Sequence, residues 1–333
     1  MMTNLRNRSE PPDLSTSASM RKPQPRAAAN VVVACESTCC LPAPLAERYG
    51  IGIIPIPFVF GDQTFLDGVD ITPSEFYARL AAASAPPKTS PPSPGEYLRM
   101  WQRMTEHAEA VVMVTPAGKL TTFNRSTRLA NELAPEALPG KRVVIVDSGS
   151  AGMGQGFVAL AAARAAQAGQ PLETVVAAAE TVAARTQLLV TLDTLEYLAR
   201  ASRIPQVAAF VGGVLAIKPI LLLAGGEIHQ LARVRTRRRS IAQLVQAMRA
   251  RVPPGAWVHA AVQHTQAEAE ARELEAILTD AFDCAELTTT EFTPVMGAYC
   301  GPGLLGVAYY VAMEAPESRG EGEANDGASP RAC

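Results

Sequence analysis

Residues 142–168 read RVVIVDSGSAGMGQGFVALAAARAAQA, which is an apolar run, a glycine-rich turn and a long alanine-rich segment. The run at 142–147 has the composition of a strand, and the segment at 152–168 has that of a helix. A strand that leads into a helix at this spacing is the repeating unit of parallel sheets covered by helices. The stretch therefore predicts an α/β fold.

The glycine-rich turn has two interpretations. Gly152, Gly154 and Gly156 open the predicted helix, where backbone N–H groups could bind a phosphate. However, Phe157 stands where a dinucleotide-binding turn has its third glycine. We therefore favour a tight, closely packed turn over a nucleotide site.

The same alternation of strands and helices surrounds this stretch. Strands are expected at 31–34, 51–60 and 110–115, and helices at 42–49, 72–83, 93–107 and 122–133. Thr72 and Ser93 each begin a capping box, with proline next and glutamate three residues on. We expect an N-terminal three-layer α/β/α domain with a parallel sheet over residues 30–170, after a disordered leader at 1–29.

A second domain is expected over residues 171–313. Its predicted helices lie at 172–184, 194–201, 205–215, 239–251 and 266–278, and its strands at 219–223, 227–234, 257–262, 286–290 and 304–311. Some strands follow one another directly, which predicts a C-terminal α/β domain with a mixed sheet. The Glu/Gly/Ser-rich tail at 314–333 is expected to be disordered.

Composition argues against several classes of protein. A formal net charge of −2 and 5% aromatic residues argue against nucleic-acid binding. The six cysteines lack both a disulfide framework and metal-ligand spacing, so no metal is expected. We find neither a signal peptide nor an apolar run long enough for a transmembrane segment, and we expect a cytoplasmic protein.

Signals for catalysis are sparse. The chain has no P-loop, HExxH or GxSxG motif. His264 follows a predicted strand and is a candidate site residue, although a structural role is favoured. A basic cluster ends in Arg237, Arg238 and Arg239. Arg237 and Arg238 are candidates for contact with a partner or a phosphate, and a solvated surface is the alternative.

Several ordered motifs resemble those of one family. Residues 36–42, ESTCCLP, resemble a DSTxDLP opening, and residues 89–96, TSPPSPGE, resemble a TSQPSPGEF signature. Shorter matches occur at 60–61, 67–71, 76–77, 146–148, 153–154, 203–204, 217–220 and 301–303. From residue 31 to residue 311, the chain resembles the DegV family.

This resemblance implies two α/β domains with a lipid tunnel between them. It also implies a bound long-chain fatty acid, no other cofactor, and a fatty-acid-kinase-type partner that phosphorylates the carboxyl group with ATP. The protein would then be a non-catalytic acyl carrier in phospholipid metabolism. The alternatives are a hydrolase or phosphotransferase-like enzyme, and a lipid-responsive regulatory protein.

The resemblance also implies residues that hold the carboxylate. A carboxylate beside an apolar tunnel must be hydrogen-bonded or it will take up a proton. In the family, the threonine of the signature donates to it, and this threonine falls on Thr89. Ser90 and Ser93 belong to the same segment and are included in the predicted site.

The second donor of the family is a serine, which falls on Thr121, with Thr122 as the alternative register. Tyr299 stands where the family has a histidine before its GPG, and its phenol can donate without being a cation. Arg203 completes the expected fatty-acid-binding set. The expected tunnel walls are Ile54, Phe58, Phe60, Ile204, Phe210, Leu215 and Ile217.

Overall fold

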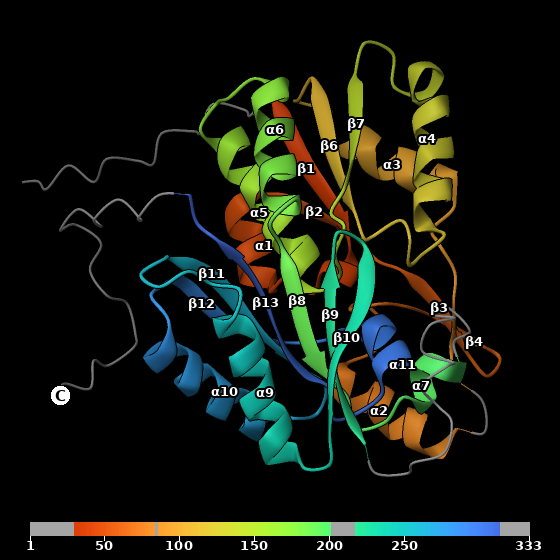
Figure 1. The fold of residues 1–333 in the computed structure, drawn as a ribbon. Helices are drawn as coiled ribbons and strands as arrows, with labels where there is room; N and C mark the ends of the chain where they lie inside the picture. The colour runs from red at the N-terminus through yellow and green to blue at the C-terminus, as the bar shows by residue number, and fades with distance from the viewer. Residues whose placement is uncertain (1–29, 84–85, 201–216, 314–333) are drawn as a thin grey trace, which may run out of the picture.

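The computed structural model describes residues 30–83, 86–200 and 217–313. They form two α/β domains, one above the other in Figure 1, with a small third sheet beside them. The two-domain fold with one parallel and one mixed sheet is as predicted. The predicted helix at 205–215, Arg203 and three expected wall residues (Ile204, Phe210 and Leu215) lie outside the described residues, as do the two expected disordered tails.

The N-terminal sheet is parallel and has the order β2-β1-β6-β7. Its strands are β1 (Val31–Glu36), β2 (Ile51–Ile54), β6 (Ala110–Thr115) and β7 (Arg142–Asp147). Val33 and Val112 face α5 (Met153–Gln167) and α6 (Leu172–Ala183), whereas Ala34 and Met113 face α3 (Pro94–Met104) and α4 (Phe123–Ala137). This alternation along buried strands produces the three layers.

Both predicted capping boxes begin helices. Thr72 caps α2 (Pro73–Ala82) and Ser93 caps α3, each with the reciprocal bond from its glutamate. The short 3-10 helix η1 (Ser37–Cys39) and α1 (Ala43–Tyr49) follow β1. Although the predicted domain boundary precedes α6, this helix packs on α5 and on the N-terminal sheet.

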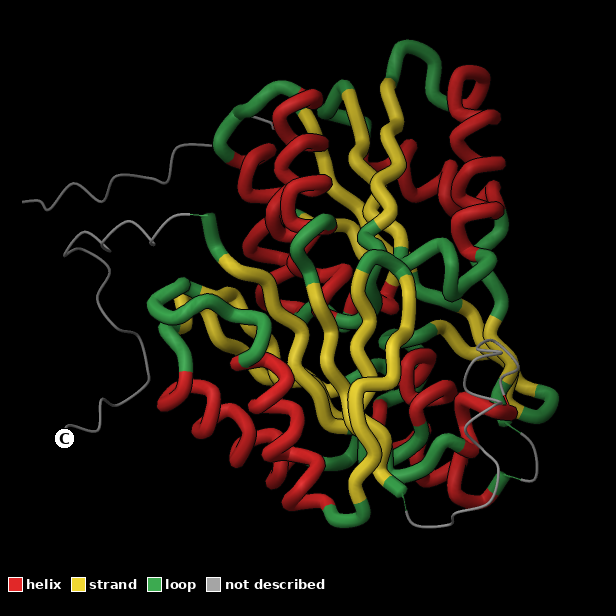
Figure 2. Tube along the Cα trace, in the orientation of Figure 1, coloured by secondary structure: helices red, strands yellow, loops and turns green. Residues whose placement is uncertain are grey.

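The C-terminal sheet is mixed and has the order β10-β9-β8-β13-β11-β12. Its strands are β8 (Gln187–Thr191), β9 (Lys218–Ala224), β10 (Glu227–Val234), β11 (Val258–His264), β12 (Cys284–Glu291) and β13 (Leu305–Val311). One face is covered by α9 (Arg237–Arg249) and α10 (Glu268–Ala281). Leu188, Ala261 and Ala308 on the other face share a core with α5, so this face meets the N-terminal domain. Figure 2 shows the two sheets meeting end to end, with helices along their flanks.

A third, antiparallel sheet has the order β4-β3-β5 and lies at the right of Figure 1. Its strands are β3 (Pro57–Phe60), β4 (Gln63–Leu66) and β5 (Lys88–Thr89). The predicted strand at 51–60 therefore divides at Pro55 and Ile56, because its second half leaves the parallel sheet. Phe58 and Phe76 pack there with Val295 of α11 (Pro294–Cys300), near α7 (Glu196–Arg200).

Candidate functional site: an apolar cavity with hydroxyl groups at one end

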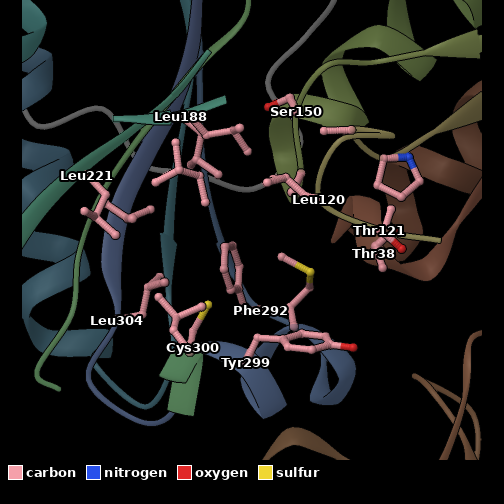
Figure 3. A pocket seen from close by; sticks show the side chains of 18 of the residues that line it. Thr38, Leu120, Thr121, Ser150, Leu188, Leu221, Phe292, Tyr299, Cys300 and Leu304 are labelled. Carbon is pink, nitrogen blue, oxygen red and sulfur yellow. The ribbon is translucent and has the colours of Figure 1, made fainter. Parts of the chain in front are cut away.

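An apolar cavity lies between the two domains (Figure 3). Its N-terminal wall comes from loops after β1, β6 and β7, and its C-terminal wall comes from the mixed sheet and α11. The lining residues are Thr38, Pro116, Ala117, Leu120, Thr121, Phe123, Ser150, Ala151, Leu188, Val190, Leu192, Leu198, Leu221, Leu223, Ile228, Phe292, Met296, Tyr299, Cys300 and Leu304. Such a wall favours an apolar ligand.

Strand alternation determines which side chains form the sheet wall. Leu188 and Val190 of β8 face the cavity, and Leu221 and Leu223 of β9 do the same. The intervening Leu189, Ile220 and Leu222 instead pack under α9 and α10. Successive strand residues point to opposite faces, so one sheet supplies both a ligand wall and a conventional core.

The expected wall residues that are described lie elsewhere. Ile54 packs in the core beneath α3, and Phe58 and Phe60 pack in the cluster around the small sheet. Ile217 is half-buried just before β9 and is not among the described lining residues. The described wall is therefore shared between the N-terminal loops and, on the C-terminal side, β8, β9, α11 and their neighbours.

Two of the predicted carboxylate donors contact each other. The hydroxyl groups of Thr89 and Tyr299 share a hydrogen bond, although the residues are 210 positions apart in the chain. Thr89 lies on β5, where it pairs with Phe58 of β3, and Tyr299 lies on α11. Tyr299 lines the cavity, and in Figure 3 its hydroxyl points away from the sheet wall.

Buried contacts fix the position of α11. The Asp67 carboxylate accepts a hydrogen bond from the Val295 backbone N–H at 3.0 Å, and burial raises the pKa of this carboxyl. Gly297 faces the Tyr77 hydroxyl so closely that a Cβ would overlap with it. Asp67 and the absence of a side chain at Gly297 together hold α11, and with it Tyr299, against α2 and the small sheet.

Thr121 and Thr122 occupy different environments. Thr121 is half-buried and lines the cavity, and its Oγ1 accepts a hydrogen bond from the Phe123 N–H at 3.2 Å. Thr122 is exposed immediately before α4 and lines a neighbouring polar cleft instead. Of the two registers, only the one with Thr121 places a hydroxyl at the apolar cavity.

Ser90 and Ser93 are exposed and are not lining residues of the cavity. The Ser93 hydroxyl accepts from the Glu96 N–H at 3.3 Å, and the Glu96 carboxylate accepts from the Ser93 N–H at 2.6 Å. The Ser93 hydroxyl also donates to the Glu96 carboxylate at 2.6 Å, and this bond, together with that from the Ser93 N–H, lowers the pKa of Glu96. Ser126 of α4 donates to the Pro92 carbonyl at 2.5 Å. Backbone groups of Pro92 and Ser93 in the signature segment are thus hydrogen-bonded to side chains of α4 and α3.

The two predicted partner-contact arginines differ. Arg237 is mostly buried, donates to the Gly303 carbonyl at 2.8 Å, and lies 3.5 Å from Asp193 and 3.7 Å from Glu270. It therefore holds the 301–303 turn. Arg238 is exposed on α9. His264 is buried at the end of β11, and burial lowers its pKa.

Sequence reasoning missed a buried polar network beside the cavity. Glu36 is fully buried, accepts from the Tyr97 hydroxyl at 3.0 Å and from the Gln155 amide at 3.1 Å, and burial raises its pKa to about 8. Thr38 of the cavity wall donates to the Gln155 Oε1 at 2.8 Å. Gln155, the one polar side chain among the first eleven residues of α5, was the available signal.

The glycine-rich turn serves packing. Gly152 has φ of +56°, and a Cβ there would meet the Gln263 side chain at 2.7 Å. The Gln263 Oε1 accepts from the Met153 N–H at 3.1 Å, at the start of α5. Among the described residues, no group of three His, Cys, Asp or Glu side chains could hold a metal ion. In that same part of the chain, no helix has the length and apolarity needed to cross a membrane.

Sequence comparisons place this fold among known proteins. A family model described as "Uncharacterised protein, DegV family" matches residues 30–312. A DegV domain-containing protein of Streptomyces coelicolor is 37% identical over 280 residues, which are 84% of this chain and 97% of the relative.

Solved structures show the same similarity. A DegV family protein from Thermus thermophilus that binds fatty acid has a TM-score of 0.77 and 29% identity, with 85% of this chain and 100% of that chain covered. DegV from Bacillus subtilis, a fatty acid binding protein, has a TM-score of 0.77 and 25% identity, with 85% and 99% covered.

Proposed function

Because the chain belongs to the DegV family, we propose that it binds one long-chain fatty acid in the cavity between its two domains. The observation that carries the proposal is an apolar wall that ends at the hydroxyl groups of Thr121 and Tyr299. Similar DegV proteins bind fatty acids, which supports the same ligand class here.

Hydrophobic burial holds the acyl chain. Each buried methylene group contributes roughly 0.8 kcal/mol before the cost of ordering the chain. The cavity wall offers leucine, valine, isoleucine, phenylalanine and methionine side chains and no charged group among the described lining residues. A long, unbranched apolar chain therefore gains the most from this site.

Hydroxyl groups bind the carboxylate in our proposal. Thr89 and Tyr299 share a hydrogen bond with each other, and both hydroxyls can rotate to donate to a carboxylate placed between them and Thr121. Donation to an ionised group is stronger than donation to another hydroxyl. The carboxylate therefore replaces the bond between Thr89 and Tyr299 with stronger ones.

We also propose that the protein is a carrier that presents its ligand to a kinase-type partner, which phosphorylates the carboxyl group. None of the described lining residues is a histidine or a carboxylate that could act as a base. Burial raises the pKa of the Cys300 thiol to about 12, so this lining thiol stays protonated and is a poor nucleophile. These features favour a carrier over a hydrolase.

The proposal is tested on purified and on delipidated protein. Organic extraction followed by mass spectrometry should release about one fatty acid per chain, and calorimetry should show that delipidated protein binds palmitate or oleate. Protein that carries no acyl ligand and binds neither acid would contradict the proposal. Hydrolysis of a fatty-acyl ester by the purified protein would instead favour the enzyme alternative.

A further inference from the structure

A polar cleft adjoins the hydroxyl end of the cavity. It is lined by Gly118, Lys119, Thr121, Thr122, Asn124, Arg125, Arg128, Leu129, Glu132 and Asp147. Thr121 lines both the cleft and the apolar cavity. A molecule bound in the cleft therefore lies beside the position that we assign to the fatty-acid carboxylate.

The outer face of α4 forms the rim of this cleft. Arg125 and Arg128 are exposed there, and Leu129 and Leu133 are 46% and 43% exposed one helical turn apart. Within the part of the chain that the structure describes, neither arginine forms an ion pair, whereas Lys119 lies 2.6 Å from Glu227. Figure 1 shows α4 on the outer flank of the N-terminal domain.

Asn124 lines the cleft, but its unsatisfied acceptor is buried. Its side chain is only 8% exposed, and its Nδ2 donates to the Asp147 carboxylate at 3.2 Å. The same Asp147 oxygen accepts from the Gly118 N–H at 3.0 Å, so the amide keeps its N–H toward Asp147. The Asn124 Oδ1 then has no partner among the described residues. This oxygen is itself buried, so it does not face an incoming ligand.

We propose that this α4 surface, made of Arg125, Arg128, Leu129 and Leu133, is the docking site for an acidic segment of a partner protein. Carboxylates of the segment pair with the two arginines, and its apolar side chains cover the two leucines. A small anion would use the arginines but not the leucines. The inference rests on the proposed function, because it assigns a surface to the partner of the carrier.

The test uses the full chain in the cells that produce it. Leu133→p-benzoylphenylalanine places a photocrosslinker on the surface, and mass spectrometry identifies the crosslinked segment. We expect an acidic segment with apolar neighbours. Arg125→Glu combined with Arg128→Glu should lower the crosslinking yield roughly tenfold, because two exposed ion pairs become repulsive. Arg239→Glu combined with Arg249→Glu on α9 is the matched control, with the same change of charge at two exposed arginines and an unchanged yield.

Three results would overturn the docking site. They are a crosslinked segment without acidic residues, an unchanged yield in the α4 variant, and a loss confined to the α9 variant. Calorimetric binding of ATP or inorganic phosphate that depends on Arg125 and Arg128 would assign the cleft to a small anion instead. The fatty-acid content of the same samples decides the proposed function separately, and an unchanged content in the α4 variant shows that the variant folds.

Discussion

The two ends of the cavity offer a ligand different kinds of contact: many apolar side chains at one end and a few hydroxyl groups at the other. The wall formed by β8 and β9 is apolar, and the burial that it offers depends on area and shape rather than on any one group. The other end depends on the hydroxyl groups of Thr89, Thr121 and Tyr299, each of which must point correctly. Under the proposed function, the wall therefore sets how tightly an acyl chain is held, and the hydroxyls select a carboxylate as its head group.

A bulky side chain that occupies space beside the apolar wall should cause the largest loss of fatty-acid affinity. In Val190→Trp the indole occupies space that the acyl chain needs, and displacing about five methylenes costs about 4 kcal/mol, roughly a thousandfold in affinity. Calorimetry with palmitate measures this loss, and Val190→Leu, which stays aliphatic, is the control. A folded Val190→Trp protein with wild-type affinity would mean that the ligand lies elsewhere.

Removing one hydroxyl should have a smaller effect on affinity. Thr89→Val keeps the shape of the side chain but loses a donor to a charged group, which costs about 1.5–3 kcal/mol, roughly ten- to hundredfold in affinity. Ser90→Ala, one position away and exposed, should leave affinity unchanged. A lowered melting temperature of delipidated Thr89→Val with unchanged affinity would reduce Thr89 to a structural residue.

The neighbouring threonines offer a matched pair at the same end of the cavity. Thr121→Val should weaken palmitate binding roughly tenfold through the loss of one donor, whereas Thr122→Val should not, because Thr122 faces the polar cleft. The same calorimetric titration measures both variants. If Thr122→Val alone weakens binding, the carboxylate lies in the cleft and our register is reversed.

A substitution at Glu36 tests whether this buried carboxyl group near the cavity affects ligand binding or only the stability of the fold. Its pKa is raised by burial to about 8, so the folded protein keeps a proton that the unfolded chain releases. Stability therefore falls as the pH rises from the ordinary glutamate pKa toward about 8, and then levels off. Glu36→Gln should remove a fall on the order of a few kcal/mol and leave palmitate affinity unchanged.

This last prediction is checked by denaturant unfolding of delipidated protein at several pH values. The comparison of Glu36→Gln with wild type isolates Glu36 from Asp67, whose pKa is also raised by burial. Equal pH dependence in both proteins would show that Glu36 is ionised in the folded state.

Local chemistry made part of this fold predictable. The capping boxes at Thr72 and Ser93 determine where two helices begin, because each satisfies orphan N–H groups within four residues. The strand at 187–191 was missed because only residues 184–186 separate it from α6, and none of them is a glycine or proline that would signal a turn. The small sheet was also missed, since two-residue β5 exists only through its pairing with β3.

The sequence by itself determined the family and, apart from β8, α11 and the small sheet, the alternation of strands and helices, and it indicated residue types that could hold a carboxylate. It could not determine which hydroxyls meet, because the contact between Thr89 and Tyr299 joins residues 210 positions apart. The residue types of β8 show that both of its faces are apolar. Which face lines the cavity is decided by tertiary packing, which places Leu188 at the cavity and Leu189 in the core beneath α9. Arg237 is the converse case. Its place in a basic cluster predicted contact with a partner at the surface. Instead, the Arg237 side chain is mostly buried and donates a hydrogen bond to the Gly303 carbonyl.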